Sequence, residues 1–162
     1  MVKLEEYFRR KVPQEGYDLF AVFARFEYAM KKGGFRRERY PDAAWQAFAQ
    51  ELPTRFFSEM VAAPQAKVYF ERPPDHLIVV GQSVGWSGKP AVPTSVTELF
   101  EAIKTARNNL FHGDKRHDSR HDVELMAAAL FVLNSAYAVA EAKAAEGNEK
   151  FRSFITEMEH GL

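Results

Sequence analysis

The chain of 162 residues contains no cysteine, and this absence excludes disulfide bonds, thiolate metal ligands and cysteine nucleophiles. Neither charge is in excess, because 22 basic residues balance 22 acidic ones. Residues 1–11 lack the apolar run and the small-residue cleavage site of a secretory signal. No stretch approaches the roughly 18 apolar residues that a membrane helix needs. We therefore expect a cytoplasmic protein without a membrane partner.

Aromatic and apolar side chains are abundant. Hydrophobic residues make up 46% of the sequence and charged residues 27%, and Phe alone occurs 14 times. This composition is typical of a folded globular protein, and the length suits a single domain over residues 1–162. So many rings predict a bulky core or a buried interface beyond it.

The charges cancel in sum but are unevenly distributed. One basic cluster consists of Lys31, Lys32, Arg36, Arg37 and Arg39. A second consists of Lys104, Arg107, Lys115, Arg116 and Arg120. Because the electrostatic field depends on distribution, a net charge of zero neither favours nor excludes nucleic acid as a partner. The first cluster fits a binding surface or a solvated helix end and turn equally well.

Helical spacing of apolar residues predicts helices in both halves of the chain. The first runs over about 17–32 and ends at Gly33 and Gly34. The second begins near Pro41 and is broken at Pro53. Thr54 is then expected to cap a further helical segment.

Two capping boxes mark helix starts in the second half. Ser95 to Glu98 begins a helix that should end near Gly113, and Ser119 to Asp122 begins a long one. The long helix is apolar around much of its circumference, which predicts burial in the core or in an oligomer interface. A short amphipathic helix over about 149–158 closes the chain.

The stretch between the two sets of helices has a different character. Residues 67–70 and 77–80 are short β-branched or aromatic runs separated by a turn signal at 72–75, which predicts a hairpin. A loop rich in Gly, Ser and Pro follows over 81–93. Its Gly88-Lys89 pair does not make a phosphate-binding loop, because Ser83 stands where the first glycine is required and Pro90 where Ser or Thr is required.

The strongest candidate site lies at Arg107, Asn108 and His112. An arginine is a permanent planar cation that forks onto phosphate, and a histidine moves protons near neutral pH. Together they supply what RNA cleavage by its own 2′-hydroxyl requires, without a metal ion. The same residues also fit an ordinary helix end, where Gly113 stops the helix and a histidine is favoured by the helix dipole.

Geometry sets a condition on this pair. Residues five positions apart on a continuous helix differ by about 140° around the axis, so Arg107 and His112 do not share one face. Either the helix loosens before Gly113 or a second copy of the chain completes the site.

Two further interpretations concern acidic residues and histidines. Glu27 is either a solvated or salt-bridged surface acid or a buried acid that orients Arg107. A zinc or manganese site could draw on His112, Asp114, His117, Asp118, His121 and Asp122. His117 precedes the expected helix start, however, so it is not paired with His121 on one face. We expect neither a metal nor another cofactor.

The segment Arg107-Asn-Asn-Leu-Phe-His112-Gly-Asp-Lys115 resembles the motif of HEPN domains, an Arg and a His separated by four to six residues with a polar residue after the Arg. Residues 23–34 resemble the first helix of bacterial HEPN proteins. The resemblance implies an all-α bundle of about five helices that dimerises through the motif helices, with a small hairpin and loop insertion over about 67–93. Many HEPN proteins are endoribonucleases in toxin–antitoxin or other defence systems.

Transferred to this chain, the resemblance implies that Arg107 and His112 are catalytic and that Asn108 positions them or the phosphate. The expected products carry 2′,3′-cyclic phosphate ends, and Lys104, Lys115 and Arg116 are the expected RNA-binding residues. The implied partners are RNA, a second copy of the chain and an antitoxin or regulatory protein. Asp114 stands where toxins silenced by a nucleotidyltransferase antitoxin carry Tyr, so that form of regulation is not expected. The alternative is a non-catalytic HEPN-like dimer that binds a nucleotide or a protein.

Overall fold

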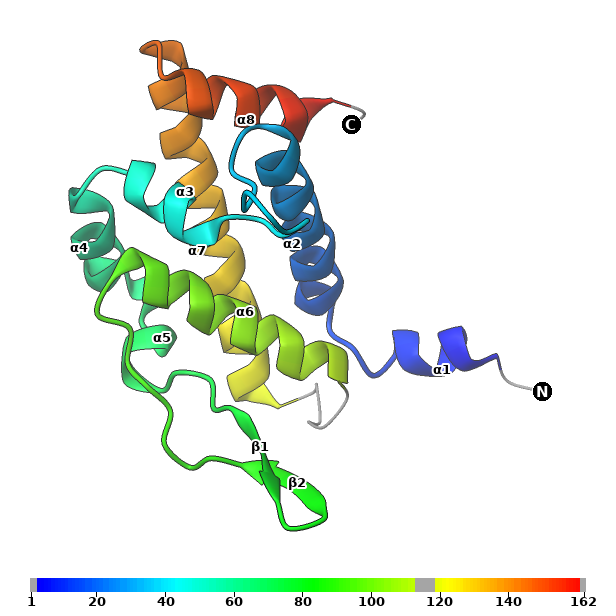
Figure 1. Ribbon diagram of the computed structural model, residues 1–162. Helices are drawn as coiled ribbons and strands as arrows, with labels where there is room; N and C mark the ends of the chain where they lie inside the picture. Colours follow the sequence, from blue (N-terminus) through cyan, green and yellow to red (C-terminus); the bar gives the residue numbers. More distant parts are fainter. Residues whose placement is uncertain (1–2, 113–118, 161–162) are drawn as a thin grey trace.

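The computed structural model describes residues 3–112 and 119–160, with His112 described by its backbone only. These residues form a mostly helical protein with one two-stranded antiparallel sheet, as the sequence predicted (Figure 1). The elements are α1 (Leu4–Arg9), α2 (Gln14–Lys32), α3 (Trp45–Glu51), α4 (Arg55–Ala62), the 3-10 turn η1 (Pro64–Ala66), α5 (Val68–Glu71), β1 (Leu77–Val80), β2 (Ser83–Trp86), α6 (Val96–His112), α7 (Arg120–Ala145) and α8 (Glu149–Glu159).

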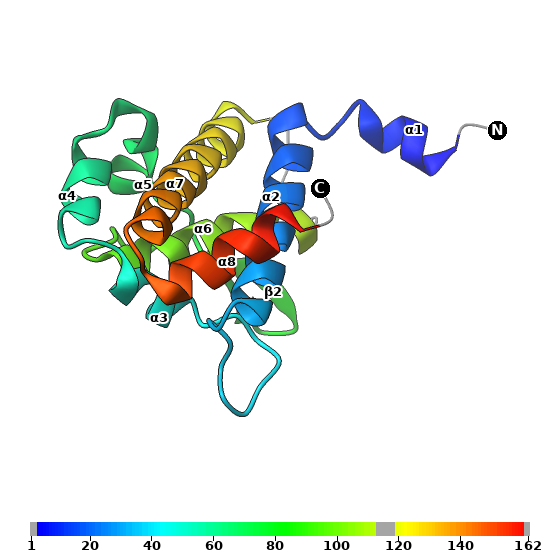
Figure 2. The same cartoon turned by 90° about the horizontal axis from the view of Figure 1, so that it is seen from above.

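Helix α7 runs through the middle of the molecule, with α2 on one side and α4 and α5 on the other (Figures 1 and 2). It packs against α2, α6 and α8, and eight of its residues are buried. By length and composition α7 also qualifies as a membrane-spanning helix, the one such helix within residues 3–112 and 119–160. The expectation that no stretch approaches this apolar content was therefore wrong, and its core position accounts for the composition.

An aromatic cluster joins α2, α3, α6 and α8. The Trp45 ring stacks on Phe23 and Phe26 with centroid distances of 5.1 and 5.9 Å, and the Phe100 ring lies 5.1 Å from it. Phe48 contacts rings from all the neighbouring helices. The many phenylalanines thus build the core that the composition predicted.

The helix starts expected from the two capping boxes are confirmed, whereas the end expected near Gly113 lies outside the described residues. Ser95 Oγ accepts a hydrogen bond from the Glu98 amide at 3.2 Å, and the Glu98 carboxylate accepts one from the Thr94 amide at 2.7 Å. At the start of α7, Ser119 Oγ accepts from the Asp122 amide at 3.1 Å. The bonds to Ser95 and Ser119 each satisfy an amide that the first helical turn leaves without an intrahelical partner, and the bond from Thr94 closes the chain that enters α6.

Helix α3 begins at Trp45, four residues later than predicted from Pro41. The reason is a closed loop over residues 36–43. In this loop the backbones of Arg36 and Ala43 form an isolated antiparallel β-bridge, and the Ala44 amide donates a hydrogen bond to the Phe35 carbonyl at 2.6 Å. Pro41 belongs to this loop. The break at Pro53 is confirmed, but Thr54 makes no side-chain capping bond to α4.

The predicted hairpin exists, but its strands are shifted along the chain. Strand β1 at 77–80 is confirmed, whereas its partner is β2 at 83–86, inside the predicted loop. Gly81 has a φ of +60° in the two-residue turn between them, a conformation suited to glycine. Residues 68–71 form α5 instead of a strand, because buried Tyr69 anchors them to α7 by donating to the Leu125 carbonyl at 3.1 Å.

Candidate functional site

The wall of a cleft of about 760 Å³ contains Arg107. The cleft lies between α2, the loop over residues 36–43, α3 and α6. Its charged lining residues are the cations Lys31, Arg37, Lys104 and Arg107 and the acids Glu27, Asp42 and Glu101. Two residues from each basic cluster of the sequence therefore meet at one cleft, which sequence spacing did not predict. Lys104 and Arg107 lie on a shared face of α6, as three-residue spacing requires.

Aromatic rings and a neighbouring amide hold Arg107. Its guanidinium carbon lies 5.3 Å from the centroid of the buried Phe23 ring and 4.9 Å from that of Phe111. One terminal nitrogen donates to Asn108 Oδ1 at 2.9 Å. The Nε atom is buried and has no hydrogen-bond partner within the described residues. A buried donor without an acceptor costs free energy, and the fold tolerates this cost at Arg107.

Asn109, which the sequence analysis passed over, ties the site helix to the hairpin. Its side chain is buried, with 7% exposed, and its Nδ2 donates to the Asp75 carbonyl at 2.9 Å. The Asp75 carboxylate in turn accepts bonds from Ser87 and from the Gly88 amide on the other side of the hairpin. The adjacent Asn108 and Asn109 were the sequence feature that could have indicated this contact. The Asn108 side chain binds Arg107, and the Asn109 side chain makes the buried bond to Asp75.

Burial raises the pKa of Asp75, but hydrogen bonds from Ser87, His76 and Gly88 outweigh it and hold the pKa below its ordinary value. The carboxylate is therefore ionised at neutral pH and fixes the base of the hairpin. Through the adjacent Asp75 carbonyl, this network positions the helix segment that carries Arg107 and Asn108.

Glu27 lines the cleft, but its hydrogen-bond partner is Trp45 and not Arg107. Its carboxylate accepts a hydrogen bond from the Trp45 indole at 3.0 Å, and no salt bridge links Glu27 with Arg107 in the described part of the chain. The half-buried acid is thus neither a free surface group nor a direct partner of Arg107. Its bond to Trp45 fixes α2 against α3 at the floor of the cleft.

Helix α6 continues without interruption through His112. Arg107 and His112 could have been brought to one face by a helix that loosens before Gly113. The helix is regular up to His112, so this possibility is excluded for the described residues. Positions 107 and 112 are about 140° apart around the axis of a regular helix. The His112 side chain, Lys115 and Arg116 lie outside the described residues.

The histidines and acids proposed as alternative metal ligands are only partly described. His121 Nε2 lies 2.8 Å from the Arg72 carbonyl, and Asp122 belongs to the N-terminal cap of α7. Within residues 3–112 and 119–160, no group of three or more His, Asp or Glu residues is placed to hold a metal ion. Asp114, His117 and Asp118 lie outside this part of the chain.

No family model, curated protein or solved structure matches this chain.

Proposed function

We propose that this protein is a metal-independent endoribonuclease with a HEPN-like fold that acts as a homodimer. The observation that carries the proposal is the environment of Arg107, whose guanidinium is oriented by Asn108 and two aromatic rings in the wall of a polar cleft. Such a cation stabilises the extra negative charge of the pentacoordinate phosphate when a 2′-hydroxyl attacks. Asn108 acts as a positioning residue, because its amide oxygen holds one guanidinium nitrogen.

His112 supplies the proton transfer in this mechanism. It accepts the proton of the attacking 2′-hydroxyl or protonates the departing 5′-oxygen. The products then carry a 2′,3′-cyclic phosphate and a 5′-hydroxyl. Since the uninterrupted α6 separates positions 107 and 112 around its axis, we propose that each cleavage site pairs Arg107 of one protomer with His112 of its partner. The biological setting proposed is a toxin or defence system.

The test is cleavage of a mixed-sequence RNA in the presence of a chelator. Arg107→Ala and His112→Ala should each reduce the rate by roughly 100-fold or more, the usual effect of losing an electrostatic or proton-transfer group. Arg55→Ala and His76→Ala are matched controls, because both residues are exposed and lie outside the cleft. Unchanged cleavage by both site variants would refute the assignment.

Mixing the two inactive variants tests the shared site. If Arg107 and His112 come from different protomers, half of the randomly mixed dimers regain one intact site, which restores about a quarter of the wild-type activity. If each protomer carries a complete site, the mixture stays inactive.

The alternative function is a dimeric module that binds a nucleotide without cleaving RNA. The volume of the cleft, about 760 Å³, favours it, since pockets of roughly 300–1,000 Å³ commonly hold small ligands. This alternative predicts saturable nucleotide binding that weakens in Arg107→Ala, together with no RNA turnover in the wild type.

A further inference from the structure

The loop over residues 36–43, here called the basic loop, is an ordered projection next to the cleft. The Arg37 amide donates a hydrogen bond to the Asp42 carbonyl at 3.0 Å, and the backbones of Arg36 and Ala43 form a β-bridge across the loop. At its base, Phe35 is buried against Phe48 and Phe151. The loop is thus closed by backbone bonds and anchored in the core, so its backbone is held in place without a ligand.

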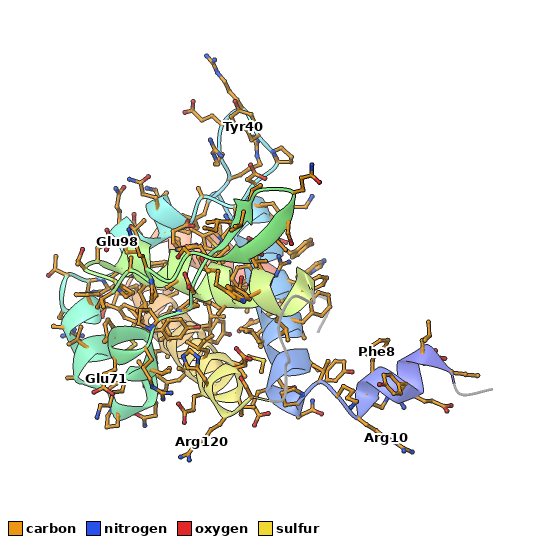
Figure 3. The ribbon with its side chains drawn as sticks, turned by 90° about the horizontal axis from the view of Figure 1, so that it is seen from below. Phe8, Arg10, Tyr40, Glu71, Glu98 and Arg120 are labelled. Atoms are coloured by element: carbon orange, nitrogen blue, oxygen red, sulfur yellow. The ribbon has the colours of Figure 1, made fainter. Side chains whose placement is uncertain are left out.

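The tip of the basic loop combines a ring with arginines. Tyr40 is 54% exposed and lies at the end of the projection (Figure 3). The Arg37 guanidinium carbon lies 4.6 Å from the Tyr40 ring centroid, and Arg36 and Arg39 are also exposed. An exposed ring beside cations is the combination that proteins use for unpaired nucleotides, because bases stack on the ring and phosphates pair with the cations.

Cations continue from the loop into the cleft. Arg37 belongs to both, and Lys31, Lys104 and Arg107 line the rest. Of the three acids there, Asp42 lies 3.6 Å from Arg37 and Glu27 accepts a hydrogen bond from Trp45. Glu101 is the remaining acid. Four cations and three acids thus line the cleft, so a phosphate passing through it toward Arg107 would meet a small excess of positive charge.

We infer that single-stranded RNA runs from Arg107 along the cleft to the basic loop, where Tyr40 stacks on an unpaired base. This inference rests on the proposed ribonuclease function, which supplies the scissile phosphate at Arg107. It adds Lys31, Arg37 and Tyr40 as substrate-binding residues and selects unpaired RNA as the substrate, because a paired base cannot stack on Tyr40.

The test is binding of a fluorescent, fully 2′-O-methylated single-stranded RNA to the full-length protein, followed by anisotropy. This probe lacks the 2′-hydroxyl nucleophile, so it reports binding whether or not the protein cleaves. Tyr40→Ala should weaken binding roughly 5- to 100-fold, as expected for one base–aromatic stack. Tyr7→Ala is the matched control, since Tyr7 is 51% exposed beside Lys11 on α1 and lies outside the cleft.

Substitutions of the charged residues Lys31, Arg37 and Glu101 test the RNA path independently of Tyr40. Lys31→Ala and Arg37→Ala should each lower the slope of log affinity against log salt by about 0.7, the value for one phosphate contact on a single strand. Glu101→Gln should tighten binding, because it removes the acid that opposes the phosphates. A duplex of the same sequence should bind wild type and Tyr40→Ala alike.

The outcomes separate this inference from the proposed function. Wild-type affinity in Tyr40→Ala together with an unchanged salt slope in Lys31→Ala and Arg37→Ala would overturn the RNA path, even if Arg107→Ala and His112→Ala abolish cleavage. Weakened binding in these loop and cleft variants supports the path, even if the wild type leaves ordinary RNA intact and the ribonuclease proposal fails.

Discussion

The two halves of α6 differ in what their side chains contact. The first half packs into the core, and the second half lines the cleft. In the first half, Leu99, Phe100 and Ile103 are fully buried, and the first turn is closed by bonds between Thr94, Ser95 and Glu98. In the second half, Lys104, Arg107 and Asn108 are half-buried polar residues, and Arg107 Nε has no acceptor. The first half therefore contributes apolar burial to the core, whereas the second half brings the cations Lys104 and Arg107 to the wall of the cleft.

This difference indicates where the helix gains and loses free energy. Apolar burial and satisfied caps stabilise the folded chain, whereas a buried unpaired donor destabilises it. Natural proteins commonly break the rules of satisfied packing at functional sites. The contrast along α6 therefore supports a functional assignment for its second half, and mutations on either side can test it.

Equivalent truncations of two phenylalanines should give the largest contrast. Phe100 is 1% exposed and Phe111 is 57% exposed, although both lie on α6. Phe100→Ala should lower the free energy of unfolding by about 3–5 kcal/mol, because it opens a cavity beside Trp45 and Phe48. Phe111→Ala should cost less than about 1 kcal/mol, from the contacts with Arg107 and Phe20. Urea denaturation of both variants measures the difference, and equal losses would contradict it.

Removing Asp75 should give an intermediate effect, centred on the second half of α6. Asp75→Ala removes the acceptor of three hydrogen bonds at the base of the hairpin and should cost about 1–2 kcal/mol of unfolding free energy. Asp18→Ala is the control, because Asp18 is exposed and accepts a hydrogen bond from Gln14 on the same helix. A loss in Asp18→Ala as large as that in Asp75→Ala would refute a special role for Asp75.

The pH dependence of the same site has a defined sign. The folded pKa of Asp75 lies below its ordinary value of 3.8, so the unfolded chain binds this proton first as the pH falls. The stabilisation is complete above the unfolded pKa and is lost as the pH falls through the folded pKa. The stability difference between wild type and Asp75→Asn should therefore be constant above about pH 5 and shrink below about pH 4.

Local rules predicted the parts of this fold that depend on local contacts. Ser95 and Ser119 marked helix starts because their side chains bond amides three residues on. The strand at 83–86 was missed because its pairing depends on a turn at Gly81. Residues 68–71 were assigned to a strand because the sequence does not show that the Tyr69 hydroxyl donates a hydrogen bond to the distant Leu125 carbonyl on α7. Likewise, Arg107 was found from residue type, whereas its cleft required Lys31 and Arg37 to arrive from another part of the chain.

Replacing Arg107 by Met should have the smallest effect on stability and thereby sharpen the contrast along α6. The change removes two cation–ring contacts of about 0.5–1 kcal/mol each. It also removes a buried donor whose unpaired state costs about 1–3 kcal/mol, while Met keeps helix propensity and packs against aromatic rings. These contributions nearly cancel, so we expect the free energy of unfolding to stay within about 0.5 kcal/mol of wild type or to rise. RNA cleavage should nevertheless fall by roughly 100-fold or more. If Arg107→Met instead unfolds as readily as Phe100→Ala, Arg107 belongs to the stabilising half of the helix and the contrast along α6 is refuted.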